Sequence, residues 1–190
     1  LLGKDPFPFD LLFWNSDSTR MPAAMHSYYL RNMYLENNLV KPGYLTLGGV
    51  KIDLRKVKVP CYFVSTLEDH IAPWKSTYMG ALLPTGATKF VLGGSGHIAG
   101  IVNPPVANKY GYWTNDATDG NLPGDPQDFL AGATQNSGSW WTHWNQWLTS
   151  LPGGSAKVKA RNAEDGPLAV IEPAPGSYVK FRLDTQKKVK

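Results

Sequence analysis

The sequence predicts an α/β fold built around two parallel strands, and three consecutive segments carry this prediction. Two short apolar runs, at 57–66 and 88–94, are bounded by turn-forming residues, which is typical of strands buried on both faces of a parallel sheet. Between them, residues 74–83 have the pattern of a helix. Because such a strand–helix–strand crossover is right-handed, both strands are expected to end at the same edge of the sheet.

The elements before this unit are predicted from start and stop signals. Residues 5–20 are rich in proline and aromatic residues and are expected to be irregular. Thr19 is the candidate N-cap of a helix over 23–39, which the Pro42-Gly43 pair would end. The alternating residues of 44–54 surround two glycines and predict a strand pair or hairpin.

After the unit, one further helix is predicted, over 139–148, with Ser139 as its N-cap. Residues 98–126 are rich in Asn, Pro and Gly and are expected to be loop, and 177–183 are expected to form a late strand. The helix carries tryptophans at i, i+4 and i+7, a stripe that indicates packing against the sheet; adhesion to an apolar polymer or membrane surface is the alternative. These residues are Trp140, Trp144 and Trp147.

Composition and charge exclude several classes of protein. Hydrophobic residues make up 42% and charged residues 18% of the chain, which is typical of a globular domain and not of a disordered one. No apolar run is long enough for a transmembrane helix, and the first ten residues lack the pattern of a signal peptide. The formal net charge of +4 arises within residues 151–190, and nothing in the chain resembles a nucleic-acid motif, so we expect a solvated basic tail.

Two loops that directly follow the predicted strands carry the candidate catalytic residues. Asp69 lies in the first loop, at 67–73, and His97 lies in the second, at 93–100. Function gathers at the carboxyl ends of strands in open α/β sheets, and a carboxylate that hydrogen-bonds an imidazole fixes its tautomer and stabilises its cation. The pair is therefore expected to be the acid and the general base of a triad, in the order nucleophile, acid, histidine that α/β-hydrolases share. Taken singly, Asp69 could instead cap a helix and His97 could be an ordinary loop residue.

The other ionisable residues are weaker candidates. Glu68 is a rival acid, but it does not stand four residues before Pro73 as Asp69 does. His70 is expected to be structural or to support the site, and His26 and His143 are expected to pack or to lie at the surface. Neither H-x-x-x-H nor a cysteine cluster occurs, so no metal site is predicted.

The nucleophile of the expected triad is absent from the chain, since neither G-x-S-x-G nor G-x-C-x-G occurs. Cys61 is the only cysteine, so no internal disulfide can form, and a reducing compartment is expected. It lies within a predicted strand, where a thiol packs as an inert apolar group. We expect the nucleophile to lie upstream of residue 1 and this chain alone to be inactive.

Six stretches of the chain carry a resemblance to a known family: LLGKDPFPFDLLFWNSDSTRMP, YYLRNMYLENNL, GGVKIDL, EDHIAPW at 68–74, GGSGHIAGIVNPP at 93–105, and SWWTHWNQWL through IEPAPGSYVK at 139–180. They resemble class I poly(3-hydroxyalkanoate) synthases, the bacterial polyester-forming acyltransferases. The resemblance covers nearly the whole chain. It implies the C-terminal portion of an α/β-hydrolase fold, with its last parallel strands and helices, plus the end of a cap region. Residues 1–40 would be the end of the cap, 41–152 the C-terminal part of the core, and 153–190 a basic tail segment of the same catalytic domain.

The resemblance also implies a Cys–His–Asp triad that acts on (R)-3-hydroxyacyl-CoA, with 3-hydroxybutyryl-CoA the expected substrate, and releases coenzyme A as a polyester chain grows. His97 is similar to the family's general base. Asp69 is similar to its aspartate, which either orients the histidine or helps to deprotonate the substrate hydroxyl. The resemblance implies no metal or prosthetic group, a homodimer, and a cytoplasmic enzyme that associates with the polyester granule surface.

Two other functions remain open from the residues alone. An esterase, lipase or polyester depolymerase would share Asp69 and His97, but would use an upstream serine and water as the acceptor. A granule- or partner-binding module would use the tryptophan helix and the basic tail, and its binding would survive the loss of both residues.

Overall fold

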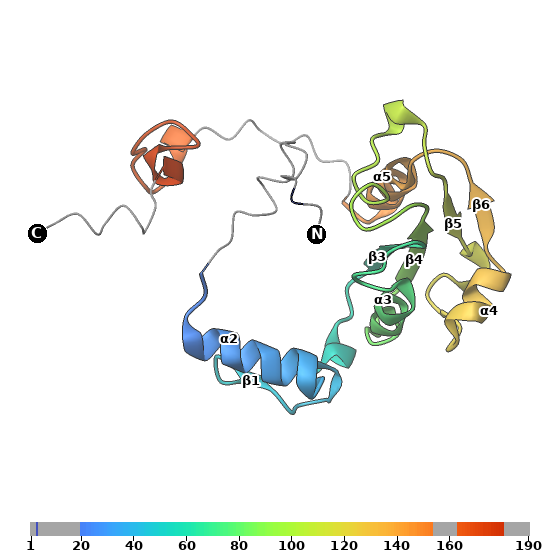
Figure 1. The fold of residues 1–190 in the computed structure, drawn as a ribbon, viewed down its shortest axis with the longest axis horizontal. Helices are drawn as coiled ribbons and strands as arrows, with labels where there is room; N and C mark the ends of the chain where they lie inside the picture. Colours follow the sequence, from blue (N-terminus) through green and yellow to red (C-terminus); the bar gives the residue numbers. More distant parts are fainter. Residues whose placement is uncertain (1–2, 4–19, 154–162, 181–190) are drawn as a thin grey trace, which may run out of the picture. The chain divides into compact units, whose positions relative to one another are not determined.

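The computed structural model of the protein describes residue 3, residues 20–153 and residues 163–180 (Figure 1). The chain divides into two compact units, Leu1–Trp147 and Leu148–Lys190. Thr19 and nearly all of the segment predicted to be irregular lie outside the described residues.

The described part of the second unit contains two 3₁₀ turns, Ala163–Asp165 and Ser177–Lys180. The strand predicted over 177–183 is therefore wrong in its first four residues, and the other three lie outside the described ranges. One carboxylate oxygen of Glu172 accepts hydrogen bonds from both the backbone N–H and the hydroxyl of Ser177, at 2.8 Å each. These local bonds favour a turn, because they satisfy groups that a strand would need to pair with a neighbour.

The helix predicted over 23–39 is confirmed at its start but ends early. An α-helix, α2 (Ala23–Tyr29), continues into π-helical turns over Leu30–Leu35. Asn37 then adopts the left-handed conformation, with φ 47°, which asparagine tolerates better than most residues. The side chain of Asn38 is buried and hydrogen-bonds Asn32, Glu36 and Lys41. This buried amide, and not the later Pro-Gly pair, ends the helix.

The predicted hairpin is confirmed. Strands β1 (Thr46–Leu47) and β2 (Val50–Lys51) pair antiparallel. Gly48 and Gly49 connect them with φ of 54° and 80°, the positive values that both central residues of a tight hairpin turn require.

The predicted strand–helix–strand unit is also confirmed. Strands β3 (Cys61–Thr66) and β4 (Thr88–Gly93) pair parallel, and α3 (Trp74–Ala81) connects them. Strand β4 is buried almost throughout, whereas β3 lies at the edge of the described sheet and is only half-buried until Ser65. The last pair in register is Thr66 with Gly93, so the two strands end at the same level.

Two short strands complete a mixed sheet with the order β3-β4-β5-β6. Strand β5 (Tyr112–Thr114) pairs antiparallel with β4, and β6 (Thr134–Asn136) pairs antiparallel with β5. The prediction of loop throughout 98–126 is therefore wrong at β5, because a strand of three residues is too short to show a period in sequence. Helix α4 (Pro126–Ala131), which was not predicted, begins where Asp125 accepts a hydrogen bond from the Gln127 N–H.

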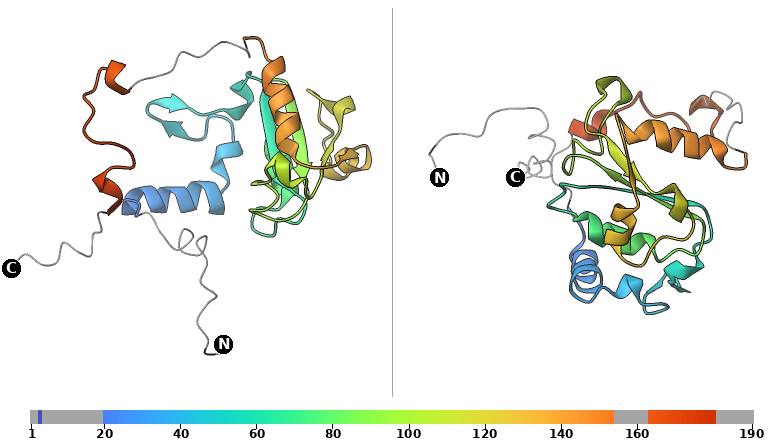
Figure 2. Two further views of the ribbon diagram at one scale, coloured as in Figure 1. Left: turned by 90° about the horizontal axis from the view of Figure 1, so that it is seen from above. Right: turned by 90° about the vertical axis from the view of Figure 1, so that its right-hand side faces the viewer.

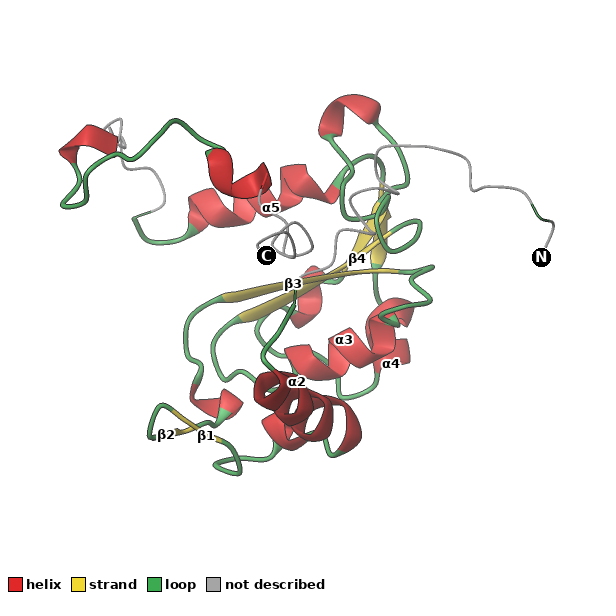
Figure 3. Ribbon diagram, turned by 60° about the vertical axis from the view of Figure 1, so that its left-hand side comes forward, coloured by secondary structure: helices red, strands yellow, loops and turns green. Residues whose placement is uncertain are grey.

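The sheet has helices on both faces (Figures 2 and 3). On one face, α3 and α4 enclose an aromatic core in which the Tyr78 and Phe90 rings lie 4.9 Å apart and the Phe90 and Phe129 rings 5.2 Å apart. The buried members of this core are Trp74, Tyr78, Ala81, Phe90, Leu92 and Phe129. Among the described helices, none has both the length and the hydropathy that a membrane span requires.

The tryptophan helix, α5 (Trp140–Ser150), packs on the opposite face of the sheet. The predicted cap is confirmed, since Ser139 Oγ accepts a hydrogen bond from the Trp141 N–H at 3.1 Å. The Tyr62 ring of β3 lies 6.3 Å from that of Trp140 and 5.1 Å from that of Trp147, whereas Trp144 is 41% exposed. Two of the three tryptophans thus pack on the sheet, as the stripe predicts.

Candidate active site

The loops that follow β3 and β4 remain joined beyond the ends of the strands. The backbone N–H of Leu67 donates to the Gly93 carbonyl at 2.8 Å, and that of Glu68 donates to the Ser95 carbonyl at 3.0 Å. The Asp69 N–H then turns back to the Thr66 carbonyl at 3.2 Å. These bonds place the residues after Thr66 beside the residues after Gly93 at the carboxyl edge of the parallel pair.

The structure brings Asp69 and His97 into direct contact at this edge. Oδ2 of Asp69 lies 2.8 Å from Nδ1 of His97. Oδ1 of the same carboxylate accepts hydrogen bonds from the backbone N–H groups of Ile71, at 2.9 Å, and Ala72, at 2.8 Å. Both oxygens are therefore engaged, and the carboxylate cannot rotate without breaking three hydrogen bonds.

The two side chains of this Asp69–His97 pair, called the dyad below, are buried to different extents. The Asp69 side chain is only 7% exposed, whereas the His97 side chain is 44% exposed. Burial raises the pKa of Asp69, but the hydrogen bonds from Ala72, His97 and Ile71 together outweigh it, so the pKa lies below its usual value. Asp69 is accordingly a carboxylate near neutral pH, and its Oδ2 accepts a hydrogen bond from the Nδ1–H group of His97.

The other ring nitrogen of His97, Nε2, accepts or donates no hydrogen bond within the described part of the chain. With the proton held on Nδ1, Nε2 carries the free lone pair. A half-exposed imidazole with a free Nε2 and a carboxylate on Nδ1 can take a proton from a nucleophile and hold it as a stabilised cation.

Two glycines allow the backbone of the second loop to approach its neighbours closely at the ends of the strands. A side chain at Gly100 would overlap the methyl group of Thr66 and the carbonyl of Gly94, and one at Gly94 would overlap the carbonyl of Tyr110. Ser95 lies between the strand and His97 with φ 67°, a conformation that costs free energy in a residue other than glycine.

The rival candidates lie away from the contact. The side chains of Glu68 and His70 are exposed, and neither makes a hydrogen bond or an ion pair in the described ranges. Cys61 begins β3, at the opposite end from the dyad, and its thiol donates to the Val59 carbonyl. His26 is exposed on α2.

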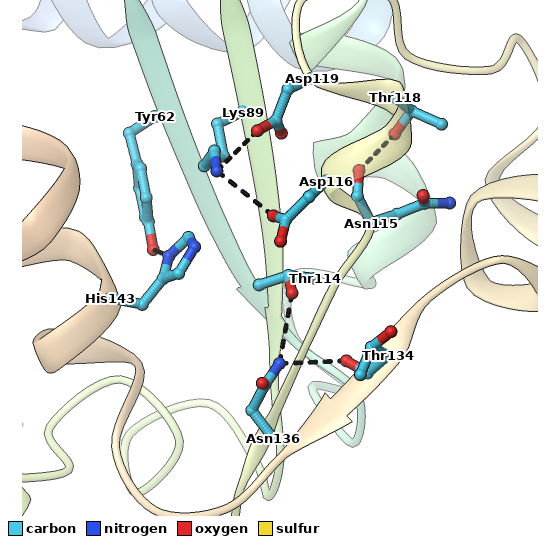
Figure 4. A network of polar contacts seen from close by, with 10 residues as sticks. All are labelled: Tyr62, Lys89, Thr114, Asn115, Asp116, Thr118, Asp119, Thr134, Asn136 and His143. Carbon is cyan, nitrogen blue, oxygen red and sulfur yellow. Dashed lines mark hydrogen bonds and ion pairs between the residues drawn. The ribbon is translucent and has the colours of Figure 1, made fainter.

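A second polar cluster, which the sequence analysis missed, lies on the face of the sheet that α5 covers (Figure 4). Lys89 of β4 forms ion pairs with Asp119 at 2.6 Å and with Asp116 at 3.4 Å. Nearby, the Tyr62 hydroxyl and Nδ1 of His143 on α5 share a hydrogen bond at 2.8 Å. Burial and the Lys89 ammonium lower the pKa of His143. Helical spacing gave no signal for this cluster, because its members come from separate elements.

No group of three His, Cys, Asp or Glu side chains that could hold a metal ion occurs in residues 20–153 or 163–180. The dyad consists of one carboxylate and one imidazole that already bind each other. The geometry therefore supports proton transfer at His97 Nε2.

No family model matches the chain, but several poly(3-hydroxyalkanoate) polymerases are similar to it over nearly all of its residues. It is 53% identical over 182 residues to the poly(3-hydroxyalkanoate) polymerase subunit PhaC of Rhizobium meliloti, covering 96% of this chain and 28% of the relative. It is 48% identical to the PhaC subunit of Cupriavidus necator, with 96% and 30% covered, and 48% identical to the poly(3-hydroxyalkanoate) polymerase of Methylorubrum extorquens, with 95% and 29% covered. The chain thus spans under a third of the length of these curated relatives. Over nearly all of its residues, the chain is thus similar to one stretch of the poly(3-hydroxyalkanoate) polymerases.

Proposed function

We propose that this chain supplies the general base, His97, and the acid, Asp69, of a Cys–His–Asp triad in a polyhydroxyalkanoate-forming acyltransferase. The observation that carries the proposal is the fixed dyad: one oxygen of Asp69 is held by two backbone N–H groups, and the other lies 2.8 Å from His97 Nδ1. The names of the relatives, all polymerases of poly(3-hydroxyalkanoate), support the choice of reaction.

The parallel pair β3 and β4 would be the last parallel strands of an α/β-hydrolase core. In that fold the acid and the histidine follow two strands in this order, and the nucleophile precedes both in the chain. Residues 1–40 would belong to the end of a cap region, 41–152 to the core, and 153–190 to a basic tail.

The reaction would proceed in two acyl transfers. His97 Nε2 takes the proton of the cysteine thiol, and the thiolate attacks the thioester carbonyl of a (R)-3-hydroxyacyl-CoA such as 3-hydroxybutyryl-CoA. The carbon–sulfur bond to coenzyme A breaks, and its thiolate leaves with the proton from His97. The hydroxyl end of a growing chain then attacks the enzyme thioester, loses its proton to the base, and returns the cysteine as a thiol.

Asp69 would stabilise the imidazolium that forms in each transfer, because its low pKa keeps it charged beside Nδ1. Direct removal of the substrate hydroxyl proton by Asp69 is the alternative role. The buried position of Asp69, with both oxygens already engaged, favours the first role. Neither transfer needs a metal or a prosthetic group.

The same proposal extends to the setting of the enzyme. We infer a homodimer in the cytoplasm that associates with the surface of its polyester granule. Helix α2 supports an apolar contact of this kind, since it buries none of its residues and exposes large apolar side chains. Those exposed by more than 40% are Met25 and Tyr29.

The test is the release of coenzyme A from 3-hydroxybutyryl-CoA by the complete polymerase, wild type beside His97→Ala. We expect release by the wild type and a loss of several orders of magnitude in the variant, with an unchanged melting temperature. Release of free 3-hydroxybutyrate instead of polymer would favour an esterase or depolymerase with a serine nucleophile. Unchanged release by His97→Ala would remove His97 from the mechanism.

A further inference from the structure

We propose that Trp140 and Trp141 are positioning residues for His97, which they hold at Asp69 through hydrogen bonds from their indole N–H groups to the loop that follows β4 and carries His97 (residues 94–104). The proposal rests on the catalytic role of His97 proposed above. Its structural part, the control of the loop by two indoles, stands on the contacts themselves.

The N-cap residue Ser139 and the first two residues of α5, Trp140 and Trp141, donate hydrogen bonds to three backbone carbonyls of this loop. Nε1 of Trp140 donates to the Gly100 carbonyl at 3.0 Å, and Nε1 of Trp141 donates to the Ile101 carbonyl at 2.9 Å. The hydroxyl of Ser139 donates to the Asn103 carbonyl. Ser139 and Trp140 are buried, so water competes little for these bonds.

The contact at Gly100 reaches His97 through one turn of backbone. The Gly100 N–H donates to the Gly96 carbonyl at 3.0 Å, and His97 lies inside the turn that this bond closes. The peptide groups on both sides of Gly100 are thus held, one by Gly96 and the other by Trp140. A shift of the indole would move the turn and, with it, the imidazole.

Side-chain burial does not explain how the turn is held. The side chain of His97 is exposed, and Ile98 and Val102 are 40% and 62% exposed. The start of the loop is fixed by its backbone bonds to the Asp69 loop, at Ser95. The indole bonds fix the loop at Gly100 and Ile101, between His97 and the buried Asn103, whose amide donates to the Lys109 carbonyl.

The test uses Trp140→Phe and Trp141→Phe, which keep an aromatic ring and remove the N–H donor. The matched control is Trp144→Phe on the same helix, because the Trp144 indole is 41% exposed and donates to no carbonyl of the loop in the described structure. Hydrogen exchange at the amides of Gly100, Ile101 and Val102 reports the order of the loop whether or not the enzyme is active, since they donate to the carbonyls of Gly96 and Ile98 on either side of His97.

In the complete polymerase, each of the first two variants is expected to exchange these amides roughly threefold to tenfold faster than Trp144→Phe. Their kcat for coenzyme A release should fall by about tenfold to a hundredfold with an unchanged KM, because misplacement of a base affects the chemical step. A general loss of packing would instead lower the melting temperature and affect Trp144→Phe in proportion.

The outcomes separate the two proposals. Loop exchange that is unchanged in both variants overturns the positioning role, even if His97→Ala abolishes activity. Faster exchange with unchanged kcat overturns it as well, provided that His97→Ala is inactive. If His97→Ala remains fully active, the proposed function fails, and faster exchange would then show only that the indoles order the loop.

Discussion

Asp69→Asn is a sharp test of the dyad, because the structure dictates how the amide must sit. The position of Oδ1 receives two backbone N–H donors, from Ile71 and Ala72, at 2.9 and 2.8 Å. An amide NH₂ group there would face two donors, so the amide oxygen takes this place. The NH₂ group is then left beside His97 Nδ1, where the carboxylate oxygen lay at 2.8 Å.

This arrangement reverses the tautomer of His97. The amide donates to Nδ1, so Nδ1 must carry the lone pair and Nε2 the proton, and Nε2 can no longer act as a base. The same change in a serine-protease triad lowers kcat roughly 10⁴-fold, which corresponds to about 5.4 kcal/mol in the barrier. Loss of one hydrogen bond to a charged group would cost only about 1.5–3 kcal/mol, or roughly 10- to 150-fold. The size of the effect therefore distinguishes a wrong tautomer from a missing contact.

The assay is single-turnover release of coenzyme A from 3-hydroxybutyryl-CoA by the complete polymerase. Glu68→Gln is the matched control, because that side chain is exposed and makes no hydrogen bond in the described structure, and its rate should stay within about twofold of the wild type. A fall of less than about 150-fold in Asp69→Asn would fit a missing contact and would refute the tautomer argument. An equal fall in both variants would mean that Asp69 has been wrongly chosen as the acid.

Three further predictions concern stability. Burial and the Lys89 ammonium lower the pKa of His143, so the unfolded chain binds a proton at His143 more readily than the folded chain does. The melting temperature should therefore fall as the pH drops below 6.5, and it should fall by less in His143→Gln. An equal fall in the variant would exclude His143 as the source of the pH dependence. Gly100→Ala should lower both the melting temperature and coenzyme A release, because its methyl group has no space, while Gly80→Ala on α3 meets nothing within 4 Å and should lower neither. Phe129→Ala, at a fully buried site, should cost about 3–5 kcal/mol in denaturant titration; a loss under about 1 kcal/mol would show that the aromatic core is not needed.

The longer elements of the fold were predictable because their signals are local. The apolar runs of β3 and β4, the helix between them and the glycine pair of the hairpin each carry their pattern within a few residues. Strands β5 and β6 have three residues each and show no period. Strand β5 pairs with the edge of β4 and β6 pairs with the edge of β5, and these edges exist only in the folded sheet.

The candidate site, like the fold, was predictable from the sequence only in part. The position of Asp69 and His97 directly after two parallel strands predicted that they could meet, and the structure brings them within 2.8 Å. Their catalytic role remains a prediction. The contacts of Ser139, Trp140 and Trp141 with the second loop were not predicted, since the two segments are separated by 36 to 40 residues. The stripe of tryptophans indicated only that the helix packs on the sheet.

The sequence alone was sufficient to identify an acid and a histidine on two loops at one sheet edge, because strand, turn and loop signals are short-range and parallel strands end together. Only the folded chain decides which oxygen of Asp69 faces His97, which nitrogen of His97 stays free, and which indoles hold its loop. Those outcomes depend on hydrogen bonds between segments far apart in the chain. Their directions are set when the sheet and α5 pack together, and no local pattern of residues encodes them.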